Sequence, residues 1–381
     1  MARTALEYAF PPDWVDTVFE ATRQRQYARE LLFSTVVELM TLVSLGLRPS
    51  LHAAARQKGT LPVSLASLYD KVNHTEPGIL RALVQGAAER LAPVMAALPA
   101  DPSLPGYELR VLDRNHLPGS DKRLAALRGH RGAALPGQSI VVYDPDSGLV
   151  VDLIAGEDAH QSERTLAIPV LERAQPGQLW IADRHFCTRT LLAGWEAAGA
   201  SFIVREHAMH PRLSHRGAWR CCGRTETGVV HEQAITQRRR RRLALRRTAA
   251  RHPDRGWRDH DPAVDQPAGP GQCRPGGRAV SPALAHRRHV PAPGGVLHSE
   301  IASLGHPRAA LLGFAVSLLA YNVLALIGRC VEQAQPQPPA PSAKTPASVP
   351  PLQVSAFHLA LSIRGGYEGM LIGRASCRER V

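Results

Sequence analysis

The sequence YELRVLD, residues 107–113, is the first of several short runs of Val, Leu and Ile in the middle of the chain. Similar runs follow at QSIVVYD (138–144), LVVDLIA (149–155), LWIAD (179–183) and SFIVREH (201–207). Their length and composition predict β-strands. Two helical patterns, residues 163–174 and 188–199, separate the last three runs. The order of three strands, helix, strand, helix and strand predicts an α/β fold.

The residues before this region show a pattern of helices. Between residues 13 and 99, apolar residues recur at three- and four-residue spacing, the period of an amphipathic helix. We therefore expect an N-terminal helical domain over residues 1–100, which fits either DNA binding or a plain helical bundle. Residues 99–105 are rich in proline and are expected to link it to the first part of the α/β domain at residues 106–236.

The composition restricts the class of protein. The chain has 381 residues, of which 44% are hydrophobic and 21% charged, which is enough apolar sequence for two or three folded domains. Its six cysteines are scattered without repeated pairs, which excludes a small secreted disulfide scaffold. The first residues lack a charged segment followed by an apolar run, so we expect no signal peptide and a cytoplasmic protein.

The net charge of +13 is concentrated in one segment. Residues 237–295 contain 14 Arg against 4 Asp, with no Lys or Glu, and so account for +10 of the total. The same 59 residues hold 8 Pro and 7 Gly but only six Val, Leu, Ile, Phe or Met residues. Such a composition buries too little apolar surface to offset chain entropy, and we predict that the segment is disordered. It is a basic nucleic-acid arm, a linker, or a stretch translated out of frame.

Two aspartates stand at the ends of predicted strands. Asp113 follows the apolar run that begins at Tyr107, and Asp183 follows the run that begins at Leu179. A single aspartate here is most simply a turn or helix-capping residue. Two of them at strand ends, where ligand sites gather in α/β sheets, favour a Mg²⁺ site built from carboxylate oxygens. Such a site activates a water or a 3′-hydroxyl and stabilises the leaving oxygen of a phosphodiester, usually with a third carboxylate.

Several longer blocks resemble the DDE transposases of bacterial insertion sequences, of the insertion-sequence-four type. These blocks are VLDRNHL (111–117), LWIADRHFCTRTLL (179–192), SFIVREH (201–207) and LGHPRAALLGFAV (304–316). The resemblance implies an RNase H-like catalytic domain, with the first catalytic aspartate on the first strand and the second after the fourth strand.

Asp113 and Asp183 match these two positions and are the expected catalytic and metal-binding residues. The resemblance also implies Mg²⁺ as the cofactor and DNA, both the element ends and the target, as the partner. A small departure from the family is Arg114, which stands where many members carry Gly.

The third catalytic residue of that family, a glutamate within Tyr-x2-Arg-x3-Glu on a helix, has no counterpart in the chain. Glu300 lies about thirteen residues beyond the expected position and is not assigned. A one-base shift of the reading frame across residues 280–295 can give Tyr-Arg-Arg-Arg-Trp-Arg-Ile-Glu, with the Glu codon spanning Arg287 and Arg288. The same shift explains the excess of Arg, Pro and Gly, because GC-rich DNA read out of frame encodes these residues. We therefore predict that residues 237–295 are out of frame and that the third carboxylate is missing.

The remaining segments are assigned from the resemblance and from composition. Residues 296–333 correspond to C-terminal helices of the catalytic domain, a Pro-rich linker covers 334–351, and 352–371 is the last native segment. The final ten residues, IGRASCRERV (372–381), can be encoded by a common sequencing adapter read in frame, which predicts a foreign tail.

One stretch, residues 309–327, is long and apolar enough to cross a membrane. Ser317, Tyr321 and Asn322 interrupt it and no aromatic belt flanks it, so we expect a buried core helix and no membrane contact.

The predicted function is that of a transposase, which cleaves DNA at element ends and joins the 3′-hydroxyl to a target. The missing carboxylate predicts that this chain is inactive. A homodimer is compatible with the sequence. One alternative is a non-catalytic relic that binds DNA through residues 13–99, and another is a protein anchored in a membrane through residues 309–327.

Overall fold

The computed structural model describes most of the chain outside its basic and Pro-rich segments. The described residues are 2–26, 29–59, 61–98, 101–117, 137–207, 215–225, 228–239, 241–251, 263–265, 297–299, 301, 304–334, 354–355 and 358–365. The predicted linker from residue 335, the tail 372–381, Glu300 and the arginine pair at 287–288 lie outside them.

A mixed sheet forms the centre of the protein, and its first five strands lie where they are predicted. They are β1 (Glu108–His116), β2 (Gln138–Asp144), β3 (Leu149–Gly156), β4 (Gln178–Ala182) and β5 (Ser201–Arg205). Their order across the sheet is β3-β2-β1-β4-β5. β2 is antiparallel to β1 and β3, whereas β4 is parallel to β1 and β5. The predicted α/β sheet is confirmed.

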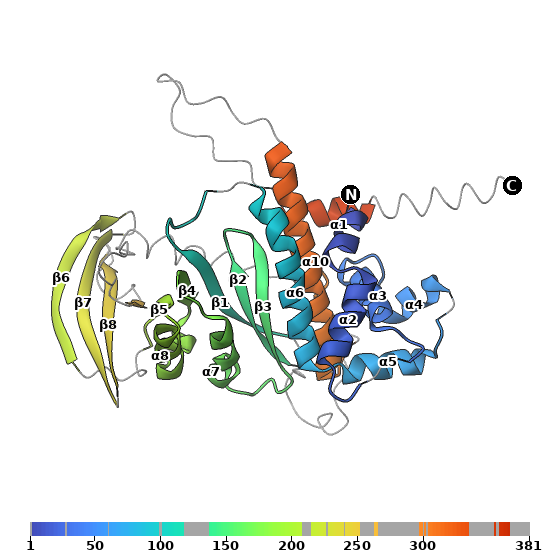
Figure 1. The fold of residues 1–381 in the computed structure, drawn as a ribbon, viewed down its shortest axis with the longest axis horizontal. Coiled ribbons are helices and arrows are strands. Elements are labelled where there is room, and N and C mark those ends of the chain that lie inside the picture. Colours follow the sequence, from blue (N-terminus) through green and yellow to red (C-terminus); the bar gives the residue numbers. More distant parts are fainter. Residues whose placement is uncertain are drawn as a thin grey trace, which may run out of the picture.

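Four further strands extend this sheet beyond β5. They are β6 (His215–Thr225), β7 (Gly228–Arg239), β8 (Arg241–Arg251) and β9 (Ala263–Asp265). β9 pairs with β5 and with β8, and β8 pairs with β7 along its whole length. The extension is visible beside β5 in Figure 1.

These strands correct the prediction of disorder for residues 237–295, in part. Residues 237–239, 241–251 and 263–265 are strands, while the other residues of that segment lie outside the described ones. The prediction was based on the scarcity of apolar side chains. A ladder of backbone hydrogen bonds to neighbouring strands satisfies peptide groups whatever the side chains are, and composition does not register this contribution.

Helices from both ends of the sequence cover one face of the sheet. The N-terminal helices are α1 (Ala2–Ala9), α2 (Pro12–Thr22), α3 (Phe33–Ser44), α4 (Leu51–Lys58), α5 (Leu65–His74) and α6 (Pro77–Ala96). Of these, α1, α3, α5 and α6 contact α10 (Pro307–Ala334), which lies beside α6 in Figure 1. One buried apolar cluster joins these helices to β1, β3, β4 and β5, so a single core crosses the boundary predicted near residue 100.

Local signals in the sequence start these N-terminal helices. Ser50 and Ser64 each accept a hydrogen bond, of 3.2 Å, from the backbone N–H three residues later and so cap α4 and α5. Pro77 occupies the first turn of α6, where the missing N–H of proline costs no helical hydrogen bond.

Short helices cover the opposite face of the sheet. They are α7 (Glu163–Leu166), the 3-10 helices η2 (Ile168–Arg173) and η3 (Arg184–Phe186), and α8 (Arg189–Ala197). Their core contains Trp180 and Trp195, whose rings stack with centroids 5.6 Å apart. The single helix predicted at residues 163–174 is divided into α7 and η2, because Pro169 lacks the N–H that an α-helix requires.

Helix α10 is the one described helix that is long and apolar enough to cross a membrane. Its most apolar window has a mean hydropathy of 2.2, but 83% of that window is buried inside the protein. The helix contacts α3, α5, α6 and β3. The structure therefore shows the buried core helix that the sequence predicts for residues 309–327.

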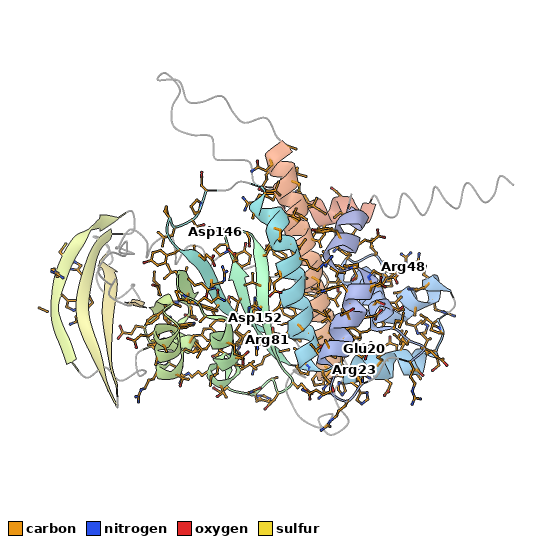
Figure 2. The ribbon with its side chains drawn as sticks, viewed as in Figure 1. Glu20, Arg23, Arg48, Arg81, Asp146 and Asp152 are labelled. Atoms are coloured by element: carbon orange, nitrogen blue, oxygen red, sulfur yellow. The ribbon has the colours of Figure 1, made fainter. Side chains whose placement is uncertain are left out.

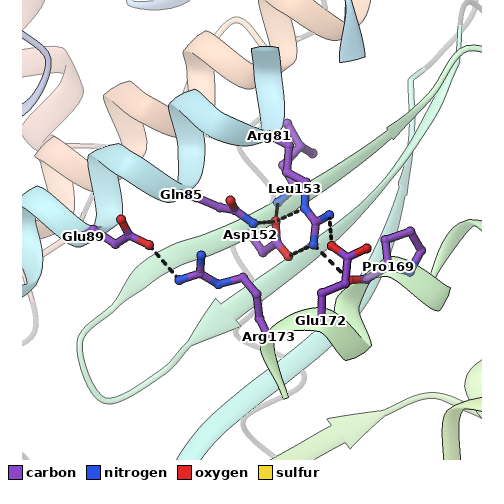
Figure 3. A network of polar contacts seen from close by, with 8 residues as sticks. All are labelled: Arg81, Gln85, Glu89, Asp152, Leu153, Pro169, Glu172 and Arg173. Atoms are coloured by element: carbon purple, nitrogen blue, oxygen red, sulfur yellow. Dashed lines mark hydrogen bonds and ion pairs between the residues drawn. The ribbon is translucent and has the colours of Figure 1, made fainter. Parts of the chain in front are cut away.

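The edge strand β3 is anchored to the helices by two polar contacts. Arg81 on α6 donates to both carboxylate oxygens of Asp152, at 3.0 Å each, and Gln85 donates to the same carboxylate at 2.8 Å. Figure 3 shows this network, and Figure 2 places Arg81 and Asp152 between α6 and the sheet. On α10, the Asn322 amide accepts from the Val150 N–H at 2.8 Å and donates to the Val150 carbonyl at 2.9 Å.

Candidate active site

Asp113 and Asp183 lie beside each other at the centre of the sheet. The parallel strands β1 and β4 pair up to Leu112 and Ala182, and the two aspartates are the next residue on each strand. Neighbouring strands lie about 4.8 Å apart. Because β1 and β4 run in the same direction, the register brings the two residues together, at the end of β4 and near the end of β1.

The two aspartates also share one face of the sheet. Val111 and Ile181 belong to the core under α6 and α10, whereas Leu112 and Ala182 belong to the core under α8. Successive side chains of a strand point to opposite faces, so Asp113 and Asp183 follow Val111 and Ile181 onto the α6 and α10 face. Asp183 retains an extended backbone, with φ −76° and ψ 169°, and continues the alternation of β4.

Local contacts orient both carboxylates. Asp113 Oδ1 accepts a hydrogen bond of 2.9 Å from the Arg114 N–H, and Asp183 Oδ1 accepts one of 2.6 Å from the Arg184 N–H. Arg205 on β5 places a guanidinium nitrogen 3.9 Å from Asp183 Oδ1. The Asp183 side chain is 18% exposed, which leaves it within reach of a ligand.

A third acid, Glu163, touches the segments that carry both aspartates. Its Oε2 accepts a hydrogen bond of 2.7 Å from Arg114, and its Oε1 lies 2.7 Å from His185 Nδ1. Sequence reasoning missed Glu163, which reads as an ordinary acid in the first turn of a helix. The signal that could have found it is Arg114, since a half-buried guanidinium in place of Gly favours an acid partner.

The residues present fit part of a divalent-cation site. Asp113 and Asp183 supply the hard oxygen ligands that Mg²⁺ prefers. Within the part of the chain that the structure describes, however, no three His, Cys, Asp or Glu side chains form a group that could hold a metal ion. The site thus has two carboxylates in place and lacks a third among the described residues.

Cys187, which follows η3, is not a nucleophile in this site. Burial raises the pKa of its thiol to about 11, although a backbone hydrogen bond at His207 opposes the shift. The reactive form of cysteine is the thiolate, so this thiol stays protonated and unreactive at neutral pH.

A family model matches the middle of the chain. Residues 105–258 match the family model described as Transposase DDE domain, a span that contains β1 to β8 and both aspartates. This segment is therefore similar in sequence to transposase DDE domains. The match covers less than half of the chain and ends inside the basic segment 237–295.

Among solved structures, the chain is similar to piggyBac transposase in a synaptic complex with hairpin DNA. The sequence identity is 8% and the TM-score is 0.40, and the likeness covers 95% of this chain and 79% of that chain. None of the curated protein sequences matches this chain.

Proposed function

We propose that this protein is an insertion-sequence transposase of the DDE type, with an RNase H-like catalytic domain. The observation that carries the proposal is the register of β1 and β4, which sets Asp113 beside Asp183 inside the segment that matches a transposase DDE domain. The strand order β3-β2-β1-β4-β5 supports the RNase H-like assignment. It makes the first strand, which carries Asp113, the neighbour of the fourth strand, which Asp183 follows.

Asp113 and Asp183 would hold a divalent cation, for which we propose Mg²⁺. When bound, the ion supplies the charge that activates a water or a 3′-hydroxyl and stabilises the leaving oxygen of a phosphodiester. The backbone N–H groups of Arg114 and Arg184 hold the two carboxylates in place. Arg205, beside Asp183, would supply a positive charge that favours a DNA phosphate bound at this site.

DNA is the partner in this proposal, both as the ends of the element and as the target. We place the protein in the cytoplasm, where bacterial DNA is accessible, and a dimer would bring two element ends together. The burial of α10 inside the protein supports a role without a membrane anchor.

We further propose that this chain is catalytically inactive because its third carboxylate has been lost. The support is that no third acid joins Asp113 and Asp183 among the described residues, and that the family match ends at residue 258. Codons exist for residues 280–295 that, read one base later, give a Tyr-x2-Arg-x3-Glu motif before α10, in the order that the family requires.

The test compares the chain as it stands with a version in which the reading frame across residues 237–295 is shifted by one base. Incubation with Mg²⁺ and DNA that carries the element ends should give nicked product only for the corrected protein. We expect at least about a 100-fold difference in rate, because the loss of one stabilising group commonly removes that much. The control is the corrected protein with Asp183→Asn, which keeps its shape and should also fail to nick.

Equal nicking by the two proteins would contradict the missing-carboxylate proposal, and another acid would then be the third ligand. Failure of both proteins to nick, with specific binding of element ends retained, would favour the DNA-binding relic. Gel-shift measurements on the same samples separate these outcomes.

A further inference from the structure

Glu163 lies, largely shielded from solvent, at a point where three segments meet. It is the first residue of α7, and its side chain is only 10% exposed. A buried carboxylate is unfavourable unless it is paired and hydrogen-bonded. Glu163 meets this requirement with one partner for each oxygen, Arg114 at 2.7 Å and His185 at 2.7 Å.

The two partners come from the two segments that carry the candidate catalytic residues. Arg114 directly follows Asp113 on β1, and His185 lies in η3, two residues after Asp183. The backbone pairing of β1 with β4 ends at Leu112 and Ala182, one residue before each aspartate. Glu163 therefore connects the two segments at the point where the backbone ladder between them ends.

A second Glu–Arg pair, on β1, provides a comparison for the pair formed by Glu163 and Arg114. Glu108 is 69% exposed and pairs with Arg110 at 3.1 Å, two residues further along β1. The Glu108–Arg110 pair lies within β1, and exposed pairs of this kind contribute little to stability. Arg110 also pairs with Asp144 on β2 at 3.2 Å, and this contact remains when Glu108 is changed. Glu163 is less exposed than Glu108 and joins β1 to η3, so its loss should alter the geometry between the segments that carry Asp113 and Asp183.

We infer that Glu163 is a positioning residue of the metal site, which holds the Asp113 and Asp183 segments together through Arg114 and His185. The inference rests on the proposed function, because it assigns Glu163 to the metal site formed by these two aspartates. Residues that orient metal ligands commonly change metal affinity 10- to 100-fold when they are mutated.

The experiment uses the full chain and two matched variants, Glu163→Gln and the control Glu108→Gln. The first readout is Mn²⁺ binding by isothermal titration calorimetry, for which we expect the Kd of Glu163→Gln to rise about tenfold or more. The second readout is hydrogen exchange of peptides that cover residues 113–117 and 183–188, which we expect to exchange about tenfold faster in Glu163→Gln. Glu108→Gln should match the unmodified chain in both readouts.

Each outcome decides the inference. An unchanged Mn²⁺ affinity in Glu163→Gln overturns the positioning role even if its thermal stability falls, since a merely structural residue would lower stability alone. If the unmodified chain does not bind Mn²⁺, the proposed metal site is wrong. In that case, hydrogen exchange that is unchanged in Glu163→Gln also overturns the role of Glu163 in connecting the two segments. Should Glu163→Gln not fold, as judged by circular dichroism, Arg114→Gln removes one of the two contacts and is held to the same criteria.

Discussion

Two groups of aspartates on the same sheet are held in different ways. Asp152, on the edge strand β3, is 3% exposed, and both of its oxygens accept hydrogen bonds from Arg81 on a distant helix. Asp113 and Asp183 accept hydrogen bonds from the backbone N–H of the residue that follows each of them, as Asp152 also does from Leu153 at 2.8 Å. Asp183 is also six times more exposed than Asp152.

The shorter charge contacts and deeper burial of Asp152 predict that it contributes more to the stability of the fold than Asp183 does, whereas Asp183 is the more exposed of the two. Arg81 neutralises Asp152 with a bidentate contact, and the acid is thereby committed to joining α6 to β3. Asp183 instead has the Arg205 guanidinium at 3.9 Å, a longer contact than either hydrogen bond from Arg81 to Asp152. Three substitutions test this contrast through the free energy of unfolding, in urea and followed by circular dichroism.

The largest loss of stability is expected for Asp152→Ala. It leaves the Arg81 guanidinium partly buried without its main partner, and breaking such a pair typically costs about 3–5 kcal/mol. The matched control is Glu172→Gln, which removes only the exposed partner of the same arginine and should cost less than about 1 kcal/mol. Equal losses in the two variants would show that Asp152 has no special structural role.

A smaller loss is expected for Asn322→Ala, which removes the other anchor of β3. The Val150 N–H and carbonyl would both lose their partner in a buried position, at about 1–3 kcal/mol. Ser317→Ala on the same helix is the control, since its buried hydroxyl bonds only within α10, to the Gly313 carbonyl. If Asn322→Ala unfolds no more easily than this control, α10 holds the edge strand by apolar packing alone.

The smallest effect on stability is expected for Asp183→Asn, although its effect on metal binding should be the greatest. Asparagine keeps the shape and an oxygen that can accept the Arg184 N–H, so unfolding should change by no more than about 0.5 kcal/mol. Mn²⁺ binding measured by calorimetry should fall below detection, because a charged ligand is lost. A loss of stability as large as that of Asp152→Ala would place Asp183 among the structural acids instead.

The sequence predicted the first five strands and the candidate acids because both depend on local patterns. Each strand is a short apolar run, and Asp113 and Asp183 each end one of these patterns. The pairing of Arg81 with Asp152 could not be predicted, because the two residues are 71 positions apart and neither belongs to a motif. Glu163 was missed for the same reason, since its partners lie at distant positions of the chain.

In the basic segment 237–295, the sequence predicted disorder where the structure has strands. Its composition argued against a packed core, yet residues 241–251 pair with β7 through the backbone. Composition estimates what side chains can bury, whereas pairing with an existing strand requires only a free row of peptide groups.

The position of α10 in the sequence has a consequence for the way the chain folds during synthesis. Its apolar side chains complete the core of α3, α5 and α6, but it begins about 200 residues after α6 ends. At a translation rate of roughly 5–20 residues per second, the nascent helices wait about 10–40 s for their central partner. During that interval their apolar faces are exposed, so we expect the emerging chain to depend on chaperones, and a ribosome that stops before Pro307 to release a product that is rapidly degraded.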